Sequence, residues 1–124
     1  MSLRDPLATA RGLGSAKSGT GHWMSQRITA VALVPLSLWF TIAAFGLGEY
    51  ADARSFLAQP LNAVLCAALV GCLFYHAQLG LQVVIEDYIH VRWLEIGLQI
   101  AVKFIAFLAA LASLLAIVRI VLGS

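Results

Sequence analysis

Apolar residues in this chain come in three long blocks that are separated by short polar stretches. The blocks run from about Ile28 to Leu47, from about Leu61 to Ile85 and from about Ile96 to Leu122. Each is about 20 residues or longer, which lets a helix cross a hydrocarbon layer about 30 Å thick. The pattern therefore predicts an all-α integral membrane protein with three transmembrane helices. We expect these helices at about 28–48, 60–88 and 96–122.

Composition supports the membrane interpretation and excludes an ordinary soluble domain. Of the 124 residues, 61% are hydrophobic and only 11% are charged. The first two blocks contain no Asp, Glu, Lys or Arg. The third block holds Lys103 near its start and Arg119 near its end, where long side chains reach the membrane interfaces. We interpret residues 1–124 as a single membrane domain.

The positive charges predict the orientation of the helices. Three spans put the N-terminus and the connection after the second span on the same side, and six of the eight basic residues lie there. We therefore expect segment 1–22 and connection 86–96 to face the cytoplasm. A bacterial inner membrane is favoured over a mitochondrial one, because the N-terminal segment is short and contains Asp5, which is unusual in a transit peptide. The six basic residues are Arg4, Arg11, Lys17, Arg27, Arg92 and Lys103.

Glycine, proline and cysteine positions refine this picture. The stretch 12–21 is rich in Gly and Ser and is expected to be flexible, and segment 50–59 is expected to be a loop. Pro35 is predicted to kink the first span. Cys66 and Cys72 lie inside the second span without a CxxC spacing, so we interpret both as small apolar residues.

One histidine, His76, lies inside the second block. An ionisable group in hydrocarbon is costly, so it usually faces the interior of a bundle and has a function. One interpretation is a hydrogen bond to a neighbouring helix, and the other is a ligand to haem iron through a neutral imidazole nitrogen. Gly80, one turn further on, favours the ligand because it leaves room for a flat macrocycle. A six-coordinate haem would need a second histidine from a partner chain.

Polar residues just before the first span are candidates for the propionate end of such a haem. Arg27 either fixes the topology through its positive charge or forms a salt bridge with a propionate, whose geometry suits a guanidinium. His22 and Ser25 precede it and are further candidates, although capping or interfacial roles are the more common ones for such residues.

A carboxylate and a phenol, Asp87 and Tyr88, stand where the second block ends. Asp87 follows His76 by three helical turns, which places the two within about 20° of each other and about 16 Å apart along the axis. The pair is either an ordinary helix end with an interfacial tyrosine or part of a quinone site. In a quinone site the Tyr88 hydroxyl would donate a hydrogen bond to a carbonyl, and Asp87 would orient it or supply protons.

These residues resemble the pattern of the D-type membrane-anchor subunits of succinate dehydrogenase, the succinate:quinone oxidoreductase of respiratory complex II. The stretch Arg27–Ala30 (RITA) matches the Arg-x-Thr-Ala motif that opens their first span. His76 with Asp87 and Tyr88 matches their His-x10-Asp-Tyr signature, and the resemblance covers nearly the whole chain. It implies an axial haem b ligand at His76, a propionate contact at Arg27, and ubiquinone contacts at Tyr88 and Asp87.

The resemblance also implies partners. The C-type anchor subunit would supply the second histidine, and an iron–sulfur subunit and a flavoprotein subunit would deliver electrons from succinate. The chain has no flavin or cluster motif, so it would act as a subunit of an enzyme that is not catalytic alone. No nucleic-acid partner is expected. Two alternatives stay open: the anchor of a fumarate reductase, and a structural membrane anchor without a redox function.

Overall fold

The computed structural model describes residues 19–123, which form three long helices and one short helix. The long helices are α2 (Gly19–Ala44), α4 (Pro60–Tyr88) and α5 (Arg92–Leu122), and all three are long and apolar enough to span a membrane. Within the described residues there is no strand. The predicted all-α membrane protein with three spans is therefore confirmed.

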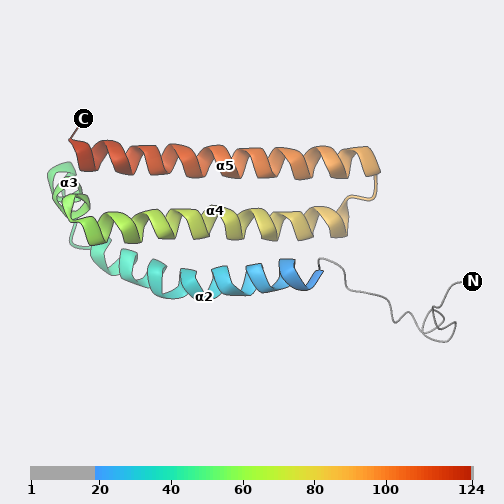
Figure 1. Ribbon diagram of the computed structural model, residues 1–124, viewed down its shortest axis with the longest axis horizontal. Coiled ribbons are helices and arrows are strands. Elements are labelled where there is room, and N and C mark those ends of the chain that lie inside the picture. Colours follow the sequence, from blue (N-terminus) through green and yellow to red (C-terminus); the bar gives the residue numbers. More distant parts are fainter. Residues whose placement is uncertain (1–18, 124) are drawn as a thin grey trace, which may run out of the picture.

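The three long helices lie side by side in one layer, with α4 in the middle (Figure 1). Helix α4 packs against both α2 and α5, whereas no Cα atoms of α2 and α5 come within 8 Å of each other. Side chains on the two broad faces of this layer are consequently exposed, and only Thr29, Cys66, Leu79 and Ile85 are buried among the described residues. An apolar surface this open fits contact with lipid and with another apolar chain.

Helix α2 begins earlier and ends earlier than the hydrophobic block from which we predicted it. It starts at Gly19 and so includes the polar stretch through Arg27, and it ends at Ala44, before Gly46 and Gly48. The predicted flexible stretch 12–21 is thus helical at its last three residues, while its earlier part lies outside the described residues, as does most of segment 1–22. Hydrophobicity alone missed this start because the first turns of α2 contain no apolar run.

Pro35 lies inside α2, and α2 is visibly curved in Figure 1, whereas α5 is straight. A proline lacks the N–H group that would bond to the preceding turn, which accounts for a bend at this point. Two hydroxyls follow the proline and bond to the carbonyls four residues earlier: Ser37 to Leu33 at 2.6 Å and Thr41 to Ser37 at 2.8 Å.

A short helix, α3 (Tyr50–Ala58), occupies the segment that we predicted to be a loop, so that prediction was wrong. The carboxylate of Asp52 accepts hydrogen bonds from the backbone N–H groups of Gly48 and Glu49, at 3.1 and 3.0 Å. Such bonds satisfy N–H groups that the first turn leaves unpaired. The ring of Phe56 stacks on Trp39 of α2 at 5.8 Å between centroids, which holds α3 against the end of the layer.

The connection between α4 and α5 is shorter than predicted. Helix α5 begins at Arg92 rather than at about residue 96, and an ion pair between Arg92 and Glu95 of 3.7 Å lies in its first turn. At the other end, Gly123 adopts a left-handed conformation with φ of 76° and terminates α5. Glycine tolerates this conformation because it lacks a Cβ atom.

Candidate functional site

The imidazole of His76 faces α2 and is bonded to it. Its Nδ1 atom lies 2.9 Å from the hydroxyl oxygen of Thr29, although the two residues are 47 positions apart in the sequence. Thr29 is only 8% exposed and is the one buried polar residue in the described part of the chain. The expected neighbour-helix hydrogen bond of His76 therefore exists, and it uses one of the two ring nitrogens.

The other ring nitrogen of His76, Nε2, has no hydrogen-bond partner within residues 19–123. The half-buried ring thus presents one anchored nitrogen and one with an unused lone pair or proton. This is the arrangement that a metal-binding histidine adopts, since its second nitrogen is usually fixed by a hydrogen bond. Within the described residues no group of three or more His, Cys, Asp or Glu side chains converges on a metal site.

Two further polar atoms on the same face of α2 are buried without a partner in the described residues. They are Nε2 of His22 and Oε1 of Gln26, which lie two turns and one turn before Thr29. A buried polar atom without a hydrogen bond is costly and calls for an explanation. A ligand or a partner chain that reaches this face would satisfy them with a donor at Gln26 Oε1, which only accepts, and with a donor or an acceptor at His22 Nε2.

Gly80 of α4 lies opposite Gln26 of α2. A Cβ atom placed on Gly80 would be 3.7 Å from Nε2 of that glutamine, which is an ordinary van der Waals distance. Ser25, the remaining candidate on α2, accepts a hydrogen bond through its carbonyl from the Thr29 hydroxyl at 2.8 Å. His76, Gly80, His22 and Ser25 are thereby brought together along the contact between α2 and α4.

Arg27 is not part of this cluster. It follows Gln26 on α2 but is exposed, and its guanidinium carbon lies 5.4 Å from the centre of the Trp23 ring. Arg27 lies two positions before Thr29, a rotation of about 200° around a helix, so it points away from α4. The cation–π contact with an interfacial tryptophan fits a charge at the membrane surface.

Asp87 and Tyr88 lie at the end of α4, beyond the last buried residue of that helix, Ile85. Both are exposed, and Tyr88 is 76% exposed. The phenol and the carboxylate are therefore accessible to a partner chain and to a ligand that enters along the layer.

Sequence reasoning missed a chain of side-chain amides that links α4 to α5. Gln78 donates to Gln82 at 3.3 Å, and Gln82 donates to Glu86 at 2.9 Å. Gln99 of α5 donates to the same Glu86 oxygen at 3.4 Å and to Glu95 at 3.4 Å. Glu86 is exposed but accepts hydrogen bonds from side chains of both helices. The i, i+4 spacing of the three α4 residues was the available signal.

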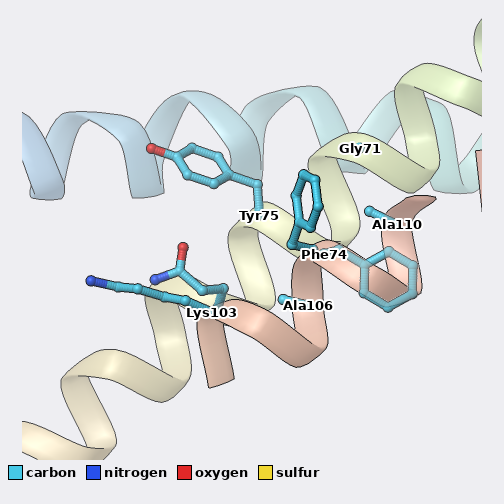
Figure 2. Close-up of a pocket in the computed structure, with 8 residues that line it drawn as sticks. Gly71, Phe74, Tyr75, Lys103, Ala106 and Ala110 are labelled. Carbon is cyan, nitrogen blue, oxygen red and sulfur yellow. The ribbon is translucent and has the colours of Figure 1, made fainter. Parts of the chain in front are cut away.

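Two cavities flank the middle helix on this half of the layer. One of about 580 Å³ is lined by His22, Ser25, Tyr75, Gln82, Glu86 and Lys103, among others. A second, of about 250 Å³, lies between α4 and α5 and shares Tyr75 and Lys103 with the first (Figure 2). In Figure 2 the hydroxyl of Tyr75 and the ammonium of Lys103 extend toward the same side of the view. The polar lining is thus concentrated near the start of α2 and the end of α4.

Fold and site together define a three-span membrane subunit. Its middle helix carries a histidine with one hydrogen-bonded ring nitrogen and ends in an exposed carboxylate and phenol. The model of the succinate dehydrogenase/fumarate reductase transmembrane subunit family matches residues 1–114. The chain belongs to this family, and within it to the D-type, hydrophobic membrane-anchor subunits of succinate dehydrogenase.

Individual relatives agree with that assignment. The succinate dehydrogenase hydrophobic membrane anchor subunit of Rickettsia bellii is 42% identical over 121 residues, which cover 93% of this chain and 94% of the relative. The corresponding subunit of Rickettsia conorii is 35% identical, over 90% of this chain and 90% of the relative. That of Paracoccus denitrificans is 34% identical, over 67% of this chain and 66% of the relative. No solved structure matched the chain.

Proposed function

We propose that this membrane anchor helps to hold a haem b, with His76 as one axial ligand and a histidine of the C-type anchor subunit as the other. The observation that carries the proposal is the state of the His76 ring, which is anchored through Nδ1 while Nε2 has no partner within residues 19–123. A haem, when bound, supplies a one-electron redox centre. The chain contributes the ligand, its orientation and an apolar surrounding that excludes water.

The residues around His76 fit such a group. His22 buries its Nε2 atom without a partner in the described part of the chain, beside the helix contact that holds the ring. The unpartnered Oε1 atom of Gln26 only accepts hydrogen bonds, so it calls for a donor from a partner chain and not for a propionate. A propionate accepts hydrogen bonds, so it suits the His22 ring when Nε2 is protonated, and Ser25 lies on the same cavity wall. Arg27 faces away from α4, so we expect its propionate contact only with a haem that extends past the edge of α2.

We further propose that Tyr88 and Asp87 form part of a site for ubiquinone reduction. The Tyr88 hydroxyl would donate a hydrogen bond to a quinone carbonyl, and Asp87 would orient the hydroxyl and relay protons from the aqueous side. Exposure of both side chains at the end of an apolar helix supports this role, because a quinone needs an apolar approach and a source of protons. The iron–sulfur and C-type subunits would complete the site.

In the complex, electrons from succinate would reach this site through the flavoprotein and iron–sulfur subunits, which would dock on the face that carries Asp87. We place that face and the N-terminus in the cytoplasm of a bacterium, because six of the eight basic residues lie on that side. A protease-cleavable tag at the C-terminus should therefore be cut in spheroplasts from outside. If the tag is cleaved only after the membrane is opened, the C-terminus lies in the cytoplasm and the orientation is the opposite of the one proposed.

The deciding experiment is a dithionite-reduced minus oxidised absorption spectrum of the gently purified complex. We expect a b-type haem signal together with a flavoprotein and an iron–sulfur protein, and we expect His76→Gln to remove that signal. His90→Gln is the matched control, since His90 is an exposed residue in the connection after α4. A complex that contains no haem, or that keeps it without His76, would favour a purely structural anchor.

A further inference from the structure

The hydroxyl of Thr29 makes two kinds of contact at once. It lies 2.8 Å from the Ser25 carbonyl and 3.1 Å from the Gln26 carbonyl on its own helix, and 2.9 Å from Nδ1 of His76 on α4. A threonine hydroxyl has one proton to donate and two lone pairs to accept with. Backbone carbonyls can only accept, so in both contacts on its own helix the hydroxyl is the donor.

The direction of the third contact follows from this count. If the Thr29 proton is bound by a carbonyl of α2, the hydroxyl oxygen faces His76 as an acceptor, and the proton between them must sit on Nδ1. A neutral imidazole carries one proton, so Nε2 is then left with a free lone pair. A lone pair at that nitrogen is what binding to iron requires.

We propose that Thr29 is the positioning residue that fixes His76 in the Nδ1–H form and presents its Nε2 atom as the haem ligand. This inference rests on the proposed function. It assigns a reason to the burial of Thr29, which is 8% exposed in a layer where the other polar side chains of the described residues are exposed or half-buried. It also ties ligand geometry to the packing of α2 on α4, because the two partners come from different helices.

Hydrogen bonds of this kind hold the ring of a metal-bound histidine and raise its basicity. Thr29→Val keeps the shape of the side chain but removes the acceptor. We therefore expect haem to be retained about 10- to 100-fold less tightly, the usual effect of losing such a partner. We also expect the midpoint potential of the remaining haem to rise, since a less basic imidazole stabilises ferric iron less.

The experiment compares complete complexes that carry wild-type, Thr29→Val, Thr29→Ala or Thr29→Ser subunits. Haem per flavin, the midpoint potential and the low-spin ferric electron paramagnetic resonance signal are measured for each. Thr29→Ser, which keeps the hydroxyl, should restore the wild-type values. The matched control is Thr41→Val on the same helix, because the Thr41 hydroxyl also donates to a carbonyl four residues back, at 2.8 Å, but is exposed.

Each outcome decides something. A raised potential and weakened retention in the Val and Ala variants, with rescue by Ser and no change in the Thr41 control, supports the proposal. Unchanged haem properties in those variants overturn it, while loss of haem from His76→Gln leaves the proposed function intact. If the Val and Ala variants fail to assemble although His76→Gln assembles, Thr29 supports packing alone and the proposal is also overturned. A wild-type complex without haem overturns both.

Discussion

Gln26 and Gly80 face each other across the contact between α2 and α4, and a methyl group on Gly80 would lie 3.7 Å from the glutamine amide nitrogen. That distance distinguishes two possible roles of Gly80, close packing of the helices and space for a ligand. Close packing of the helices does not require it, because the neighbouring helix has room for a Cβ atom. A remaining reason for glycine at this position is the approach of a flat ligand to the backbone beside His76, which would have to take the place of the Gln26 side chain.

Gly80→Ala tests this distinction. We expect the subunit to assemble normally, with the helix itself favoured by about 1 kcal/mol, but to retain less haem per complex. The measurement is the haem-to-flavin ratio after purification in detergent. Gly71→Ala is the control, because Gly71 lies on the same helix and a methyl group there would have nothing within 4 Å of it among the described residues. Equal haem content in both variants would remove Gly80 from the haem site.

Tyr88→Phe should lower quinone reductase activity by about 10²-fold or more, the usual size of a general acid–base contribution. Transfer of electrons from succinate to a soluble dye should stay normal, because that route does not need the quinone site. Steady-state rates with a short-chain ubiquinone and with the dye give the comparison. Tyr50→Phe serves as the control, since Tyr50 is 70% exposed at the opposite end of the layer. Parallel loss of both activities would argue against a quinone contact.

Arg27 offers a test between topology and ligand binding. Arg27→Lys keeps the positive charge, so the orientation of the spans should be unchanged, but it loses the planar fork that pairs with a carboxylate. We expect weaker retention of haem in Arg27→Lys and a further decrease in Arg27→Gln. Haem content is measured against flavin, and Arg54→Gln at the other end of the molecule is the control. Full haem content in both Arg27 variants would leave the residue as a membrane-surface charge held on Trp23.

Asp52→Ala should destabilise α3. The carboxylate accepts two backbone N–H groups, from Gly48 and Glu49, and loss of such a cap costs about 1 kcal/mol. Hydrogen exchange in detergent should show faster exchange in α3 with little change in α4. Ser55→Ala is a suitable comparison, because its hydroxyl bonds only to a carbonyl within the same helix. Unaltered exchange would mean that the stacking of Phe56 on Trp39 is sufficient to hold α3.

The long helices could be predicted from the sequence because an apolar segment of this length crosses a membrane as a helix, which satisfies its backbone hydrogen bonds internally. Helix α4 spans the same residues, 60–88, that its pattern indicated, since Pro60 and the charged pair after Ile85 mark its ends. Helix α3 was missed because it is short and polar, and its signal is local: Asp52 stands three residues after Glu49, the spacing of a cap. The early start of α2 was missed because its first turns also contain no apolar run.

The sequence singles out candidate residues but not how they are arranged. His76 stands out in an apolar run, whereas its contact with Thr29 depends on how α2 and α4 are rotated against each other, which no local pattern specifies. The departure of Arg27 from the cluster has a simpler origin. A rotation of about 200° from Thr29 follows from the numbering alone once the buried face of α2 is known.

The single layer of helices also bears on how the cell disposes of the unassembled subunit. Gln82, Glu86 and Lys103 line the cavity of about 580 Å³ described above. An amide group that faces lipid, such as that of Gln82 within the span, is unfavourable in hydrocarbon. A copy without its partner subunits would therefore expose a polar group that the assembled complex covers. We expect membrane proteases to degrade it quickly when its partners are absent, which a pulse-chase measurement would register as a shortened half-life. Assembly would then be a form of protection, and the stoichiometry of the complex would follow from turnover rather than from matched synthesis.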